Sequence, residues 1–135
     1  MNNTRLSTAL HILSLLAHSE GDLLTSEWIA GSIGVNPVIV RKEMAVLKKA
    51  GLVESLAGKE GGTRLAKPAQ KIKLSEVYQA VQQATLLGKK NLQPNPNCPV
   101  GKKINDQLEA LYAEAEEKLM KFLAKKTLAE FSSVF

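Results

Sequence analysis

Residues 35–67 read VNPVIVRKEMAVLKKAGLVESLAGKEGGTRLAK, and the order of signals in this stretch decides the fold. A helix is expected to start at Asn36-Pro37, because asparagine caps a first turn well and proline at the first helical position loses no hydrogen bond. Gly51 is a typical left-handed residue just past a helix end. The helix should therefore run from Pro37 to Ala50.

A β-hairpin is expected directly after this helix. Two segments with strand composition, Leu52–Leu56 and Thr63–Lys67, flank a turn that runs from Gly58 to Gly62. Pro68 cannot donate a ladder hydrogen bond and ends the second strand.

Two helices are expected before this stretch. From Leu6 to Ala17 apolar residues lie nearly all round a helix, so we expect neighbouring elements or a second subunit to cover it on two faces. A short helix should begin at Thr25 or Ser26 and end at Ile33, with Trp28 and Ile29 among its inward residues, before a turn at Gly34. This order predicts a mainly α-helical winged helix-turn-helix, with the two-stranded hairpin as the wing.

The remaining chain predicts a helix, a loop and a long helix. Ser75 should cap a helix that continues to about Leu87, with Ala84 on its inward face, and residues 88–101 have loop composition. A helix over about 102–125 would be roughly 35 Å long. Because so long a helix is difficult to bury in a small domain, we expect it to pair with its copy. The near-heptad stripe for this dimerisation comprises Ile104, Leu108, Leu111, Ala115, Leu119 and Phe122.

The positive charge of the chain is concentrated in one region. The net charge is +5, and residues 41–73 hold nine of the 18 Lys and Arg residues but three of the 13 Asp and Glu residues. A local excess of this kind favours contact with a polyanion over general solubility.

The outer face of the helix that starts at Pro37 carries the candidate DNA contacts, although a solvated helix with lysines for solubility is the alternative. Arg41 has the fork geometry that binds guanine O6 and N7, Val38 can contact a thymine methyl group, and Asn36 can bond a phosphate or an adenine edge. We expect the lysines of this helix to contact phosphates, which give affinity without sequence information. They are Lys42, Lys48 and Lys49.

The hairpin turn is either a plain turn or a DNA-contacting wing. Its glycines, Gly58, Gly61 and Gly62, allow positive φ angles and close backbone approach. Lys59 and Arg64 favour the wing. The six aromatic residues are not interleaved with the basic run, so binding by base stacking to single strands or RNA is not expected.

Other classes of protein lack support in the sequence. The apolar runs are too short for a membrane span, and no secretory cleavage pattern follows the N-terminal residues. Cys98 is the single cysteine, which excludes an intrachain disulfide framework and fits the cytoplasm. His11 and His18 would lie roughly 10 Å apart along one helix, too far to share a metal. Since no catalytic constellation stands out, we do not expect an enzyme.

Four segments in register resemble the Rrf-type bacterial transcription regulators, the group of IscR, NsrR and CymR. The segments are STALHILSLLA, AGLVESLAGKEGGTRLAK, IKLSEVYQAV and KKTLAEF. The resemblance implies a homodimer built on the long C-terminal helix, with recognition helices in successive major grooves of a palindromic site and wings in the minor groove. The family's DNA contacts map onto Asn36, Val38, Ile39 and Arg41, and onto Gly58, Lys59, Gly61 and Gly62.

The sequence departs from this family in two places. Many members have an arginine in the wing where Ala57 stands here, and Lys59 or Arg64 are its candidate substitutes. Sensing members carry three cysteines before the long helix, whereas this chain keeps Cys98 at the position that resembles the last of them. We therefore expect no iron–sulfur cluster, metal or other cofactor. Regulation would come through a small molecule, a partner protein or oxidation of Cys98.

The sequence as a whole predicts a cytoplasmic, homodimeric, sequence-specific repressor that binds double-stranded DNA. Residues 1–73 would form the DNA-binding domain, and residues 74–135 the dimerisation region. Two alternatives stay open. One is an interaction module that docks a partner protein through the 88–101 loop, and the other is a thiol-based redox sensor that acts through Cys98.

Overall fold

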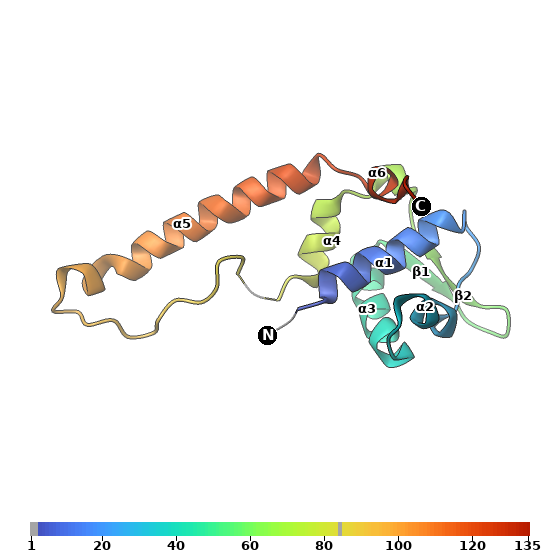
Figure 1. The fold of residues 1–135 in the computed structure, drawn as a ribbon, viewed down its shortest axis with the longest axis horizontal. Coiled ribbons are helices and arrows are strands. Elements are labelled where there is room, and N and C mark those ends of the chain that lie inside the picture. The colour runs from blue at the N-terminus through green and yellow to red at the C-terminus, as the bar shows by residue number, and fades with distance from the viewer. Residues whose placement is uncertain (1–2, 84) are drawn as a thin grey trace. The chain divides into compact units, whose positions relative to one another are not determined.

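A computed structural model of the chain describes residues 3–83 and 85–135 and is mainly helical (Figure 1). Its elements confirm the predicted winged helix-turn-helix fold. In chain order they are α1 (Arg5–His18), α2 (Ser26–Ile33), α3 (Pro37–Lys49), β1 (Val53–Leu56), β2 (Gly62–Leu65), the 3-10 turn η1 (Ala69–Lys71), α4 (Leu74–Val81), α5 (Pro99–Ala124) and α6 (Leu128–Ser132).

These elements form two structural units. The first contains the chain up to Gln82 together with Leu123–Phe135, and the second contains Gln83–Phe122. The first unit thus holds the helix-turn-helix, the wing, α4 and α6, while most of α5 lies in the second. The functional division expected at residue 73 stays a prediction.

The helix-turn-helix is held by local caps. Thr25 Oγ1 accepts a hydrogen bond from the Trp28 N–H at 3.1 Å and starts α2. Gly34 ends α2 in the left-handed conformation, with a φ of 81°, which glycine adopts without steric cost. Asn36 Oδ1 accepts from the Val38 N–H at 2.9 Å and starts α3 at the predicted residue. The turn between the two helices is therefore fixed by side chains within a few residues of it.

Helix α1 is the centre of the hydrophobic core. Ala9, Ile12, Leu13 and Leu16 are buried because α2, α3, α4, α6 and β2 of the same chain pack around α1. The fully buried side chains of the core come from these helices, from the turn before β1 and from the segment before α4; they include Ile12, Leu13, Leu16, Ile29, Val40, Leu47, Leu52, Ile72, Val77 and Leu128.

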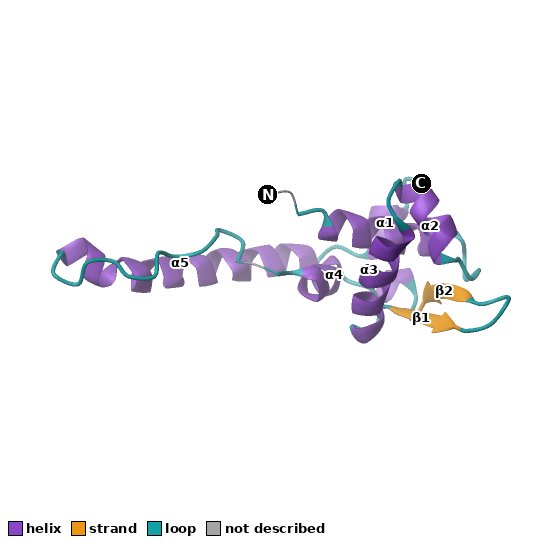
Figure 2. Ribbon diagram, turned by 90° about the horizontal axis from the view of Figure 1, so that it is seen from below, coloured by secondary structure: helices purple, strands orange, loops and turns teal. Residues whose placement is uncertain are grey.

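The wing is anchored to the helix-turn-helix by a third extended segment. Strands β1 and β2 are antiparallel, and Val53 lies opposite Leu65. Leu24, just before α2, exchanges two backbone hydrogen bonds with Thr63 of β2, with N–O distances of 3.0 and 2.9 Å. In Figure 2 the loop between the two strands projects beyond the helices.

Several expected boundaries and orientations were wrong. Trp28 was expected to face the core but is 56% exposed, because Ile29 and Ala30 form the buried side of α2. Helix α4 ends at Val81, since Leu86 and Leu87 are exposed and bring no further apolar surface to the core. Ala84, expected on the inward face of that helix, lies outside the described residues.

The last helix, α6, was not predicted. Thr127 caps it by accepting a hydrogen bond from the Glu130 N–H at 3.1 Å. The segment before it pairs with the segment before α4: the Leu128 N–H donates to the Ile72 carbonyl at 2.8 Å, and the Leu74 N–H donates to the Lys126 carbonyl at 2.9 Å. Leu128 is completely buried in the core. The chain therefore returns to the first unit after α5.

Within residues 3–83 and 85–135, no helix is both long enough and apolar enough to cross a membrane.

Candidate nucleic-acid interface

Helix α3 has a buried face and an exposed face, as its sequence predicts. Val40, Met44 and Leu47 are buried against the core. Val38, at the first turn, is 62% exposed, and Ile39 beside it is also exposed. Apolar side chains held at the surface near a helix N-terminus have the chemistry that contacts thymine methyl groups. The cations of this face, Arg41, Lys42, Lys48 and Lys49, are exposed as well.

Arg41 has an acidic neighbour on α2. Its Nη1 atom donates to Glu27 Oε1 at 3.2 Å, and both side chains are more than half exposed. Exposed ion pairs of this kind contribute about 0–1 kcal/mol. The pair therefore orients the guanidinium in the free protein without preventing it from binding a base or a phosphate.

The cap at Asn36 restricts what this residue can bind. Its Oδ1 atom already accepts a hydrogen bond from the Val38 N–H, so one of the two lone pairs of this oxygen is occupied. Adenine recognition by asparagine needs both the donor and the acceptor of the amide, whereas a phosphate oxygen needs only the donor. A phosphate contact through Nδ2 therefore leaves the cap unchanged, whereas adenine recognition requires Oδ1 to accept a second hydrogen bond.

The turn of the wing requires its glycines. Gly58 has a φ of 107°, and the Gly61 N–H donates to the Gly58 carbonyl at 3.1 Å. A Cβ atom on Gly61 would clash with the Leu56 carbonyl oxygen, and one on Gly62 would lie 2.8 Å from the Leu24 carbonyl oxygen. The close backbone packing of this turn presents Lys59 at an exposed position.

The two basic residues of the wing are in different environments. Arg64 Nε donates to Glu54 Oε1 at 2.7 Å, and the two residues lie directly opposite each other in the hairpin. Lys59 takes part in none of the ion pairs found among residues 3–83 and 85–135. Lys59 is therefore the cation at the end of the wing, where the acidic Glu60 follows it directly.

A buried ion pair that the sequence reasoning missed fastens α3 to α1. Glu43 is 4% exposed, and Arg5 of α1 binds its carboxylate with two nitrogens, Nε to Oε2 and Nη2 to Oε1, each at 2.9 Å. The hydrogen bonds from Arg5 to Glu43 raise the pKa of the guanidinium, against the effect of burial. The sequence did contain a signal for this pair, because Glu43 lies three residues after Val40, on the face of α3 that carries the buried apolar residues.

The apolar stripe of helix α5 is only partly covered by the described residues. None of its 26 residues is buried, and Leu111, in the middle of the expected stripe, is 54% exposed. Two ion pairs, Glu114–Lys118 and Glu117–Lys121, lie on other positions of the helix. The other stripe residues Ile104, Leu108, Ala115 and Leu119 are partly exposed, and Phe122 is exposed.

Cys98 immediately precedes α5, which begins three residues earlier than expected. The backbone N–H groups of Gly101 and Val100 lower the pKa of the Cys98 thiol. The Cys98 N–H donates to the Asn95 carbonyl at 3.2 Å. Gly101 permits this compact turn, because a Cβ atom there would lie 2.6 Å from the Asn95 carbonyl oxygen.

Comparison with known proteins found one matching family and relatives over nearly the full length. Residues 2–133 match the profile of the Rrf2 family, described as iron-dependent transcriptional regulators. YwnA of Bacillus subtilis, assigned by name as an HTH-type transcriptional regulator, is 42% identical over 130 residues, which are 96% of each chain. A crystal structure of a protein described as DNA-binding has a TM-score of 0.76 and 39% identity, and the alignment covers 94% of this chain and 97% of that one. CymR of B. subtilis, the global cysteine regulator, has the same fold with a TM-score of 0.72 and 19% identity, over 100% of this chain and 98% of CymR.

Proposed function

The chain belongs to the Rrf2 family of transcriptional regulators, and we propose that it is a cytoplasmic homodimer that binds a palindromic operator and represses transcription. Its relatives are regulators rather than enzymes. The observation that carries the proposal is the exposed face of α3, where two apolar side chains and an arginine are surrounded by lysines. The wing, which carries Lys59 and Arg64, lies in the same structural unit as this face.

Residues at the start of α3 would read the base sequence. Val38 and Ile39 are exposed and apolar, so they fit methyl groups in the major groove, and Arg41 fits guanine. Lys42, Lys48 and Lys49 would bind phosphates on either side and set the register of the helix in the groove.

The wing would contact the minor groove or the phosphates beside it. Gly58, Gly61 and Gly62 give the narrow turn, and Lys59 supplies the charge. Lys59 is the better substitute for the arginine that the family carries at the position of Ala57, because Lys59 is exposed in the turn at the end of the wing, whereas Arg64 lies on β2. Arg64 would then contribute mainly to the long-range attraction of DNA.

Dimerisation through α5 would explain its exposed apolar stripe. Leu111 and its neighbours on the stripe recur at nearly heptad spacing, which is the pattern of paired helices. A dimer with two-fold symmetry presents two identical α3 helices, and these match two half-sites of opposite orientation. A palindromic operator follows from this symmetry.

The iron dependence that the description of the family gives does not fit the residues of this chain. The described residues contain no group of three or more His, Cys, Asp and Glu side chains placed to hold a metal ion. Cys98 offers one sulfur ligand, whereas iron–sulfur clusters are held by three or four cysteines.

Selection from a genomic fragment library tests the proposal. The purified protein would be mixed with sheared genomic DNA at about 150 mM salt, and the bound fragments sequenced after washing with competitor DNA. A recovered motif with two-fold symmetry supports the regulator. A featureless pool that salt removes would refute sequence-specific binding and favour the alternative of a partner-docking module. The same selection is repeated with Lys118→Ala, which removes one positive charge outside the proposed DNA interface. It controls for general charge effects and should recover the same motif.

A second candidate function, thiol-based redox sensing, is favoured by the lowered pKa of Cys98. The thiolate would attack hydrogen peroxide, the O–O bond would break, and Cys98 would become a sulfenic acid with release of hydroxide. The position of Cys98 at the start of α5 gives such an oxidation a route to the proposed dimer helix. Operator affinity of the wild type and of Cys98→Ser should be measured with and without peroxide. An equal response of the two proteins would exclude this function.

A further inference from the structure

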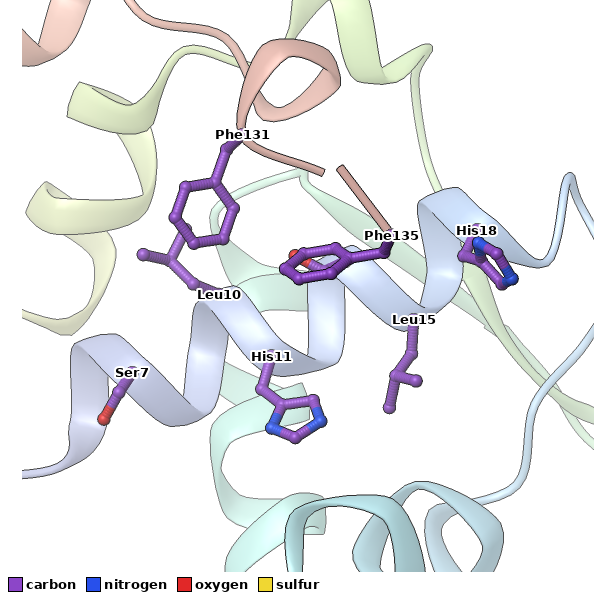
Figure 3. Close-up of a pocket in the computed structure, with 8 residues that line it drawn as sticks. Ser7, Leu10, His11, Leu15, His18, Phe131 and Phe135 are labelled. Carbon is purple, nitrogen blue, oxygen red and sulfur yellow. The ribbon is translucent and has the colours of Figure 1, made fainter. Parts of the chain in front are cut away.

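A cleft between α1 and α6 is not used by the proposed DNA contacts. Its volume is about 520 Å³, and all of its lining residues belong to the first structural unit. Leu10, His11, Leu15 and His18 of α1 line one side, and Phe131 of α6 lines the other together with Phe135 (Figure 3). The two phenylalanine rings pack edge to face, with their centroids 6.2 Å apart.

The walls of the cleft are mainly apolar, with a few polar groups. Both phenylalanine rings are exposed to solvent, so a ligand that covered them would remove apolar surface from water. Ligand sites of this size are typically lined by aromatic and aliphatic side chains with a few polar groups that set the orientation. Aromatic rings prefer aromatic partners in edge-to-face or offset arrangements, which Phe131 and Phe135 can provide.

Ser14 supplies the observation that points to a ligand. Its side chain lines the cleft, it is 6% exposed, and its Oγ atom is fully covered and makes no hydrogen bond with any described residue. Buried hydroxyl groups nearly always have a hydrogen-bond partner, because burial removes their hydrogen bonds to water and this loss costs free energy when no new partner replaces the water. A polar atom of a bound molecule would satisfy this hydroxyl.

The cleft is connected to the helix-turn-helix by a hydrogen bond. His11 Nε2 lies 3.1 Å from Ser32 Oγ of α2, so the same imidazole lines the cleft and contacts the helix that precedes α3. Helix α1 also binds α3 through the pair of Arg5 with Glu43. A ligand that shifts His11 or α1 would therefore change the position of α3.

We propose that this cleft binds a small aromatic molecule that carries one hydroxyl or carboxyl group. The oxygen of the ligand bonds Ser14, its ring packs against Phe131 and Phe135, and its binding changes the affinity for DNA through His11. The binding site itself does not depend on the proposed function, whereas the effect on DNA rests on it.

Phenol and benzoate are suitable probes, with cyclohexanol as a non-aromatic control. Each is titrated to about 10 mM into the full chain, and amide chemical shifts are followed by NMR. We expect shifts at α1 and α6 with phenol or benzoate and a several-fold weaker effect of cyclohexanol. The absence of shifts there with both aromatic probes would overturn the proposal. The proposal would also be overturned if a second copy of the chain covers the cleft. In that case Phe135→Ala should dissociate the dimer.

Ser14→Ala separates the ligand role from a structural one. Removal of an unpartnered hydroxyl should leave the melting temperature of the free protein unchanged or raise it, while the affinity for the aromatic probe falls roughly two- to tenfold, as expected for one lost hydrogen bond. Ser19→Ala, directly after α1 and outside the cleft, should bind the probe normally. Equal affinity of wild type and Ser14→Ala would refute the role of Ser14.

The regulatory step is tested on the selected operator. The probe should change the dissociation constant for DNA at least threefold in the wild type and leave that of Ser14→Ala unchanged. If the probe binds but the operator affinity stays constant, the regulatory coupling is wrong and the binding site stands. If no specific operator can be selected at all, the proposed function fails independently of the NMR result.

Discussion

Replacing Arg5 by alanine leaves a carboxylate without its partner inside the protein. Glu43 is 4% exposed and accepts hydrogen bonds from two nitrogens of Arg5, whose own side chain is 19% exposed. In the variant, the Glu43 carboxylate would lose both donors while it stays largely shielded from water. Helix α3 would then lose its polar attachment to α1.

The size of the effect follows from the burial of the pair. Removal of one partner from a buried ion pair costs about 3–5 kcal/mol. Because Arg5 is itself partly exposed, water can reach the vacated space and solvate part of the charge. We therefore expect a loss of about 2–4 kcal/mol in the free energy of unfolding, which corresponds to roughly 10 °C in Tm for a chain of this size.

Urea unfolding of three variants measures this loss. Arg64→Ala is the matched control, because it breaks an arginine–glutamate pair whose side chains are 41% and 48% exposed and should cost at most about 1 kcal/mol. The double variant Arg5→Met, Glu43→Leu replaces both partners by apolar side chains of similar length. Its stability should return close to that of the wild type, since no buried charge remains unpaired.

Two results would refute this reasoning. If Arg5→Ala costs no more than Arg64→Ala, the Glu43 carboxylate is not shielded from water in solution. If the double variant is as unstable as Arg5→Ala, the loss comes from the packing of the arginine side chain rather than from an unpaired charge.

Four further predictions concern the proposed interfaces and the thiol. Arg41→Ala should weaken operator binding by about 1–3 kcal/mol and relax one base position in a selection experiment; an equal loss on random DNA would assign Arg41 to a phosphate. Gly61→Ala should disturb the wing, because the added Cβ clashes with the hairpin backbone, and amide shifts of β1 and β2 should report it while the melting of the helices is nearly unchanged. Leu111→Glu should yield monomers in sedimentation experiments and Ala113→Glu dimers; dimers from both would exclude the apolar stripe of α5 as the interface. Alkylation of Cys98 should reach its half-maximal rate at a lower pH in the folded protein than in the urea-unfolded chain, since the folded state lowers the pKa of the thiol and so favours the thiolate; equal midpoints would contradict this.

The helix-turn-helix could be predicted from the sequence because its signals are local. Thr25, Gly34 and Asn36 each act on backbone groups no more than a few residues away, and each does so in the structure. The orientation of Trp28 could not be predicted in the same way. In an eight-residue helix, Trp28 and Ile29 are both apolar neighbours, and tertiary packing alone selects which of them faces the core.

The parts of the site that escaped prediction depend on distant partners. Arg5 and Glu43 are 38 residues apart in the sequence, and no residue near Glu43 indicates that Arg5 neutralises its charge. The pairing of Arg41 with Glu27 likewise crosses the turn between two helices. The basic face itself could be predicted, because charge and helical periodicity place it without reference to any other element.

The position of Leu128 in the chain has a consequence for synthesis on the ribosome. This residue fills the core of the first unit, yet it follows all 26 residues of α5. Because chains emerge N-terminus first, the core around α1 stays open until the long helix has been made. Nascent or truncated chains that lack α5 therefore also lack a completed core, and a cell that degrades loosely packed chains would remove them before they could occupy DNA as incomplete copies.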